Sequence, residues 1–155
     1  MSRALTVLSA ALLAVAASGC RRNEPAAVKI RDHTWTVELA TDPEARQRGL
    51  SGRTDLPAGT GMLFVFPRQA TRTFYMRQTL VPLDIAFISS GEVVMDVRTM
   101  PVEADPSDPK AYYTGRHPAQ YVLEVPAGEL RAGGVRPGDR VELLGAASDA
   151  AKAAR

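Results

Sequence analysis

The sequence predicts a mainly β fold, a compact barrel-like or folded-over antiparallel sheet with one short helix against it. Apolar and polar residues alternate along several short segments, and one segment alone carries clear helix start and stop signals. The length of 155 residues suits one domain after a leader segment. The formal net charge of +2 gives no indication of nucleic-acid binding.

Strands are expected where apolar and polar side chains alternate, because successive side chains of a strand point to opposite faces. Trp35, Val37 and Leu39 alternate with polar residues, whereas GMLFVF at 61–66 is apolar on both faces and typical of a central strand. Residues 83–97 predict a hairpin that turns at Ser89-Ser90-Gly91. Two further strands are expected in AQYVLEVPAG and DRVELLG.

The helix is expected near 42–50. Thr41 and Glu44 have the spacing of a capping box, Pro43 suits the first helical position, and a glycine follows. A second short turn is expected in AGELRAGG. The proline-containing segment 101–118 is expected to be a loop on the surface.

The first nineteen residues have the pattern of a secretory signal, with an apolar run from Ala4 to Ala17 that is too short for a permanent membrane span. The following AASGC resembles a bacterial lipobox, which predicts cleavage before Cys20 and a lipid anchor on that cysteine. We therefore expect a membrane-anchored protein that faces the periplasm or the cell exterior, with Arg21 favouring the outer membrane. The predicted organisation is a signal peptide at 1–19, a tether at 20–27, a β domain at 28–145 and a disordered tail at 146–155.

Familiar chemical motifs are absent from the sequence. It has no G-x-S-x-G, no phosphate-binding loop and no H-E-x-x-H. Two histidines and one cysteine give no metal-ligand spacing, so neither a metal nor another cofactor is predicted. The protein is expected to be a monomer.

Six arginines and only one carboxylate, Asp55, lie between residues 46 and 77. Such a concentration suits recognition of carboxylates or phosphates. Alternatively, these arginines lie on solvated faces and pair with Glu38, Asp84 or Glu124. The arginines are Arg46, Arg48, Arg53, Arg68, Arg72 and Arg77.

Several motifs occur in the order typical of one family: EARQRGLSGR, GMLFVF, TFYMRQTLVPLDIAFI, YVLE and a late Pro-Gly pair. From about Val28 to Leu144 the chain resembles the bacterial and archaeal family called domain of unknown function 192. The resemblance implies a mainly β, barrel-like fold and no established activity. The chain has Ser51, Tyr75, Arg77 and Gln78 where the family often has Met, Trp, Lys and Asn.

These motifs suggest a shallow cleft that binds an anionic or saccharide ligand without catalysis. An alternative is a hydrolase or lyase of envelope polymers that uses Asp84 or Glu44 as general acid or base. A third interpretation makes the motif structural, with Asp84 held by Arg53 or Arg77. The predicted ligand-binding residues are Arg53, Phe74, Tyr75, Met76, Arg77, Gln78, Thr79 and Asp84.

Overall fold

Nine strands and three short helices make up residues 24–155, the part of the chain that the computed structural model describes. The predicted mainly β fold is confirmed. In chain order the elements are β1 (Ala27–Ile30), β2 (His33–Ala40), α1 (Pro43–Arg48), β3 (Thr60–Ala70), β4 (Thr73–Phe74), β5 (Leu83–Ile88), β6 (Val94–Met100), β7 (Tyr113–Thr114), β8 (Ala119–Pro126), α2 (Glu129–Ala132), β9 (Val141–Leu144) and α3 (Ala146–Ala153).

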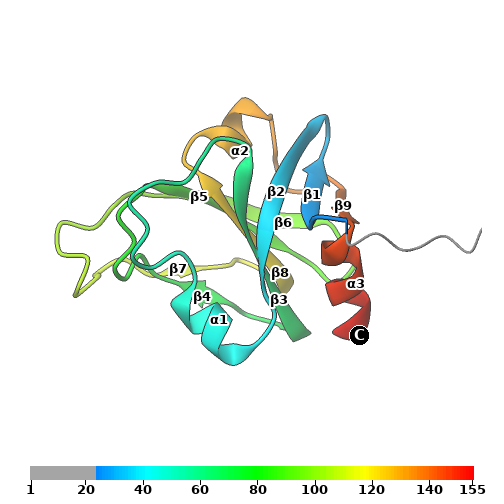
Figure 1. The fold of residues 1–155 in the computed structure, drawn as a ribbon, viewed down its shortest axis with the longest axis horizontal. Helices are drawn as coiled ribbons and strands as arrows, with labels where there is room; N and C mark the ends of the chain where they lie inside the picture. The colour runs from blue at the N-terminus through cyan, green and yellow to red at the C-terminus, as the bar shows by residue number, and fades with distance from the viewer. Residues whose placement is uncertain (1–23) are drawn as a thin grey trace, which may run out of the picture.

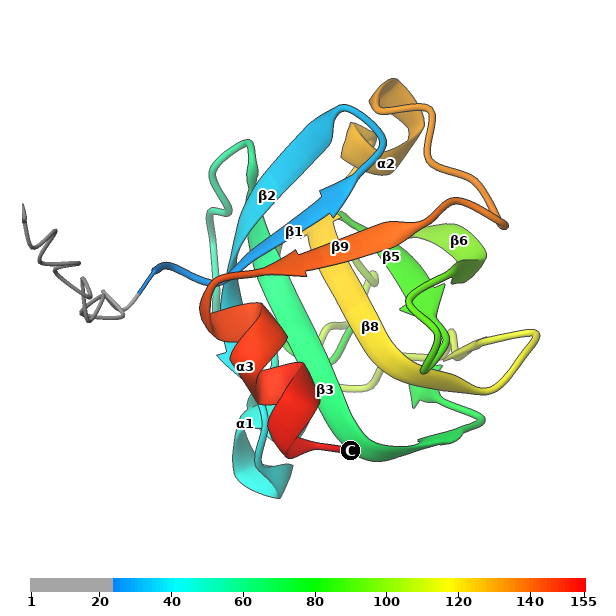
Figure 2. The same ribbon diagram turned by 90° about the vertical axis from the view of Figure 1, so that its right-hand side faces the viewer.

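Seven of these strands form one curled sheet in the order β6-β5-β8-β3-β2-β1-β9 (Figures 1 and 2). All neighbours are antiparallel except β2 and β3, which pair in parallel because α1 lies in the crossover between them. A bridge between Val93 and Arg140 brings the two edges of the sheet together. The edge strands β6 and β9 themselves do not pair in the described chain, so the sheet is a curled half-barrel and not a closed barrel. The short strands β4 and β7 form a separate two-stranded ribbon.

The sheet is buried on both faces, and each face has its own apolar core. Trp35, Leu63 and Leu123 belong to the first core, which also receives Leu130 from α2. Phe64 and Phe87 belong to the second core, which is covered by the residues after α1 and by the β4–β7 ribbon. This second face carries the candidate site described below.

The predicted hairpin at 83–97 is present as β5 and β6, and its turn is closed by a hydrogen bond from Glu92 N to Ser89 O of 3.0 Å. The predicted helix is α1, with Pro43 in its first turn. Its cap is Asp42 rather than Thr41, since Asp42 Oδ1 accepts from Ala45 N at 2.8 Å. The turn expected in AGELRAGG is the helix α2.

The C-terminal segment differs from the prediction of a disordered tail at 146–155, because α3 occupies most of it. Ala147 and Ala151, one helical turn apart, are buried against the first core. Alanine has the highest helix propensity, and its small side chain allows the helix to lie close to the sheet. An alanine-rich end is thus a packed helix here.

The predicted signal peptide, Cys20 and the start of the tether lie outside the described residues. Within residues 24–155, no helix has the length and apolar character needed to cross a membrane.

Candidate functional site

A cavity of about 320 Å³ opens on the second face of the sheet. Helix α1 and the turn after it supply one wall, and the segment from the end of β3 through β4 to Thr79 supplies another. Its aromatic lining consists of Phe64, Phe66, Phe74 and Tyr75. Its charged lining consists of Arg46, Arg48, Arg72, Arg77 and Glu124. The volume lies at the lower end of the range of roughly 300–1,000 Å³ that is usual for small-ligand pockets.

Glu124 is the one carboxylic acid that lines this cavity in the described chain. It comes from the middle of β8, where its neighbours Leu123 and Val125 point into the first core and its own side chain points to the opposite face. The residue is 6 % exposed, and no residue within 24–155 donates a hydrogen bond to its carboxyl group. Burial raises the pKa of Glu124 to about 8. At neutral pH this side chain is therefore mostly a neutral hydrogen-bond donor.

Arg46 and Arg72 are held in place at the cavity by backbone carbonyl groups. Arg46 Nη1 donates to the carbonyls of Thr41 and Val65, at 2.5 and 3.0 Å. Arg72 donates to the carbonyls of Ala119 and Arg68, at 3.3 and 2.5 Å. Carbonyl groups orient a guanidinium without neutralising it, so both positive charges persist at the cavity.

Both guanidinium groups also lie over the ring of Phe66, with Cζ 5.2 Å from the ring centroid for Arg46 and 3.8 Å for Arg72. Burial, together with the positive charges of Arg46 and Arg68, lowers the pKa of Arg72 from its usual value. Within residues 24–155 no carboxylate forms an ion pair with any arginine of the cavity. The cavity is thus a site of uncompensated positive charge.

Two further hollows, each of about 400 Å³, adjoin the cavity. The middle hollow is lined by Glu44, Gln47, Arg48, Ser51, Tyr75, Arg77 and Gln78. The outer hollow is lined by Tyr75, Arg77, Ser107, Asp108, Pro109 and Tyr112. Tyr75 and Arg77 line the cavity and both hollows, so the same two side chains border all three spaces.

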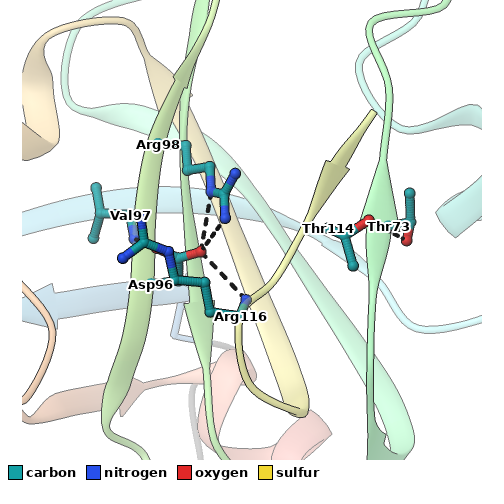
Figure 3. A network of polar contacts seen from close by, with 6 residues as sticks. All are labelled: Thr73, Asp96, Val97, Arg98, Thr114 and Arg116. Carbon is teal, nitrogen blue, oxygen red and sulfur yellow. Dashed lines mark hydrogen bonds and ion pairs between the residues drawn. The ribbon is translucent and has the colours of Figure 1, made fainter. Parts of the chain in front are cut away.

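The ribbon that carries Phe74 is fixed to the main sheet through Asp96 (Figure 3). The Asp96 carboxylate accepts from Arg98 Nη2 at 2.9 Å and from the backbone N–H of Arg116 at 3.3 Å. Within the ribbon, the hydroxyl groups of Thr73 and Thr114 lie 2.9 Å apart. These contacts anchor the strand β7, which in turn holds β4 at the wall of the cavity.

The predicted site residues are divided between the cavity and other places. Phe74, Tyr75, Arg77 and Thr79 line the cavity, and Gln78 lines the middle hollow. Arg53 instead forms an ion pair with Glu38 at 2.6 Å, as in the alternative interpretation of the arginines. Met76 is 1 % exposed and belongs to the second core.

The expectation that Asp84 pairs with an arginine was wrong, because no arginine within residues 24–155 contacts its carboxylate. Its carboxylate accepts from Thr99 Oγ1 at 2.6 Å and from the backbone N–H groups of Gly128 and Leu130 at 2.8 and 3.1 Å. Three neutral donors, two at the beginning of α2 and one on β6, thus satisfy a carboxylate that is 1 % exposed. Asp84 does not line the cavity. Glu44, the other candidate acid, lines the middle hollow.

The sequence interpretation missed the position of Glu124 in the cavity and treated this residue only as a partner for an arginine. The available signal was a single acid inside the apolar run YVLEV, the same kind of signal that drew attention to Asp84. Within residues 24–155, no three His, Cys, Asp or Glu side chains lie close enough to hold a metal ion.

Fold and site together define a class of small half-barrel proteins with an arginine-lined cavity on one face of the sheet. The chain belongs to the DUF192 family, described as Uncharacterized ACR, whose model matches residues 26–143. The family resemblance inferred from the motifs is therefore confirmed.

Two solved structures are similar to the chain over most of its length. A proposed transcription regulator of Sinorhizobium meliloti 1021 is 34 % identical, with a TM-score of 0.70 over 77 % of this chain and 94 % of the other. A protein of unknown function from Novosphingobium aromaticivorans DSM 12444 is 32 % identical, with a TM-score of 0.68 over 75 % of this chain and 83 % of the other. A search of curated proteins finds no match.

Proposed function

We propose that the protein is a binding module that holds a small ligand with an anionic group in the arginine-lined cavity. The observation that carries this proposal is the combination of uncompensated guanidinium groups with the unpartnered, buried carboxyl group of Glu124. A carboxylate or phosphate on the ligand would supply the missing negative charge. A hydroxyl or carbonyl oxygen elsewhere on the ligand would accept the proton of Glu124.

The aromatic side chains of the cavity support a ligand with an apolar face as well as polar groups. Phe64 and Phe74 pack edge to face with ring centroids 5.0 Å apart, and Phe74 packs in the same manner against Phe87 at 6.0 Å. These contacts fix the wall before a ligand arrives, which lowers the entropic cost of binding. Sugar acids and sugar phosphates combine the required features, and they define the ligand class that we propose.

A thermal-shift screen of the full-length chain in detergent tests this proposal. The probes are uronic acids, sugar phosphates and short dicarboxylates, each compared with a neutral sugar of the same size. A binding anion should raise the melting temperature, whereas the neutral sugar should not. Arg77→Ala removes one exposed guanidinium of the cavity, and a lost charge-assisted hydrogen bond of ~1.5–3 kcal/mol weakens binding about 10- to 100-fold.

Arg131→Ala is the matched control, because Arg131 is an exposed arginine on α2, away from the residues that line the cavity. It should leave binding unchanged. The proposal fails if no anion stabilises the wild-type chain, or if Arg131→Ala weakens binding as much as Arg77→Ala does.

We also propose that the protein is exported and anchored to a membrane through a lipid on Cys20, on the basis of the signal and lipobox pattern. The described chain begins beside α3, where the amide of Ala146 donates to the carbonyl of Glu24 at 3.2 Å. In Figure 1 this point lies on the side away from the loop between β6 and β7, which carries Tyr112 of the outer hollow. Such a tether would leave the hollows accessible. Incorporation of a clickable fatty acid tests the anchor: wild type should be labelled and Cys20→Ser should not.

A hydrolase or lyase acting on envelope polymers is the second candidate, and the position of Glu124 favours it over the acids first considered. A carboxyl group that keeps its proton at neutral pH beside arginines is suited to general acid catalysis. Incubation with acidic envelope polysaccharides, followed by an assay for new reducing ends or unsaturated products, tests this candidate. Products formed by wild type and lost in Glu124→Gln would support it.

A further inference from the structure

Two tyrosines stand side by side on the surface next to the cavity. Tyr75 is 42 % exposed and Tyr112 is 67 % exposed. Their ring centroids are 6.1 Å apart with an interplanar angle of 60°. Exposed aromatic side chains that lie next to each other and beside a pocket are typical of binding surfaces.

The backbone segments that carry these two rings are held next to each other without a ligand. Tyr75 follows Phe74, and Tyr112 precedes Tyr113, which is the residue paired with Phe74 across the β4–β7 ribbon. The backbone N–H of Gln78 also donates to the carbonyl of Pro106 at 2.7 Å. This hydrogen bond joins the loop after Tyr75 to the loop before Tyr112. The tyrosine pair is therefore a preorganised platform.

The two hollows add polar groups that the cavity lacks. The middle hollow shares Gln47, Arg48 and Ser51 with the cavity and adds Glu44 and Gln78. The outer hollow adds Ser107 and Asp108, and Arg77 lines all three spaces. Carboxylate and amide oxygens accept hydrogen bonds from hydroxyl groups, but they repel a chain of closely spaced phosphates. This mixture of donors and acceptors favours a ligand rich in hydroxyl groups, with acidic groups only at intervals.

We propose that the cavity and the two hollows form one continuous groove for an acidic oligosaccharide, with Tyr112 and Tyr75 as the stacking platform for a sugar unit outside the cavity. This inference rests on the proposed function, because it places one acidic unit among the arginines of the cavity. A sugar ring has an apolar C–H face that stacks on tyrosine and an edge of hydroxyl groups that bonds to the polar lining. Arg77, which lines all three spaces, contacts the junction between units.

Calorimetric titration of the full-length chain in detergent with galacturonic acid and its oligomers of two, four and six units tests the groove. The wild-type chain should bind the tetramer about tenfold more tightly than the monomer, since each additional contact adds to the affinity of one molecule. Tyr112→Ala should reduce this ratio to about one, and Tyr112→Phe should retain it because the ring remains. Leu80→Ala is the control, since Leu80 is 45 % exposed and lines neither the cavity nor the hollows.

Equal affinities for monomer and hexamer overturn the groove while leaving the cavity proposal intact. An unchanged ratio in Tyr112→Ala, or an equal fall in Leu80→Ala, also overturns it. If no uronate of any length binds but another small anion does, the oligosaccharide inference fails and the proposed function stands. If no anion binds at all, both fail. A peptide or nucleic acid that binds more tightly than every uronate oligomer would likewise overturn the inference.

Discussion

Replacement of Glu124 by glutamine should remove a large part of the pH dependence of stability. The folded chain holds the Glu124 carboxyl group in a cavity where burial raises its pKa from 4.5 to about 8. The unfolded chain exposes the same group to water, where it ionises near its ordinary pKa. Between pH 4.5 and 8 the folded state therefore binds more protons than the unfolded state, and the free energy of unfolding falls as the pH rises.

The size of the effect follows from the two pKa values. Each pKa unit corresponds to about 1.4 kcal/mol. Because the pKa of Glu124 is 4.5 in the unfolded chain and about 8 in the folded chain, the free energy of unfolding falls by roughly 5 kcal/mol as the pH rises through this range. The contribution is fully present below pH 4.5 and is lost above pH 8. Glutamine has nearly the same shape and does not ionise. Between pH 5 and pH 9, Glu124→Gln should gain about 4 kcal/mol relative to wild type.

Thermal unfolding followed by circular dichroism at pH 5, 7 and 9, at constant ionic strength, measures this difference. The gap between the melting temperatures of Glu124→Gln and wild type should grow by roughly 10 °C from pH 5 to pH 9. Glu142→Gln is the control, because it removes an exposed carboxylate of β9 that pairs with Lys29. Parallel pH curves for wild type and Glu124→Gln would refute the assignment of a buried, protonated acid.

Three further predictions concern residues around the site. Asp84→Ala should lower the free energy of unfolding, measured in urea, by about 3 kcal/mol, because the N–H groups of Gly128 and Leu130 lose their acceptor. Ligand affinity at the cavity should not change, and a loss of affinity without a loss of stability would contradict this structural role. Gln78→Asn should raise the free energy of unfolding in urea by about 0.5 kcal/mol, since Gln78 has a φ of 52° and asparagine tolerates the left-handed region better. A lower free energy of unfolding in the variant would contradict this explanation. Asp96→Ala should accelerate amide hydrogen exchange at residues 113–116 more than in β1, because Arg116 N and Arg98 lose their acceptor. Equal acceleration in both places would contradict the role of Asp96 as a local anchor of β7.

The elements that the sequence predicted are those determined by local patterns. The hairpin of β5 and β6 has alternating apolar residues and a serine-glycine turn, and α1 has a proline at its start and Gly49 at its end. Gly49 has a φ of 49°, a conformation that other residues rarely adopt. Both signals lie within a few residues of the element that they define.

The elements that the sequence did not predict depend on distant contacts. Strands β4 and β7 have two residues each, too few for any periodic pattern, and exist because segments about forty residues apart meet. Helix α3 has five alanines among its eight residues, and only the sheet beneath it distinguishes a packed helix from a frayed end. The parallel pairing of β2 with β3 similarly depends on the path of the whole crossover.

Two carboxylic acids on neighbouring strands show why the site itself was only partly predictable. Asp84 and Glu124 each interrupt an apolar strand, and in the sequence they look alike. The register of β5 and β8 pairs Ile85 with Glu124 and Asp84 with Val125, so the two acids point to opposite faces of one sheet.

What covers each face then determines the chemistry of the acid. The beginning of α2 covers Asp84 and gives its carboxylate two backbone donors, with a third from Thr99, so the group serves to hold the helix. Aromatic side chains and guanidinium groups line the space beside Glu124, and none of the described residues donates a hydrogen bond to it. A buried carboxyl group that receives no hydrogen bond is more stable in its protonated form, so Glu124 keeps its proton. At the cavity this proton is available for a hydrogen bond to a ligand. The distinction between an acid that holds a helix and an acid that lines a cavity thus arises from strand register and loop packing, neither of which is encoded within either motif.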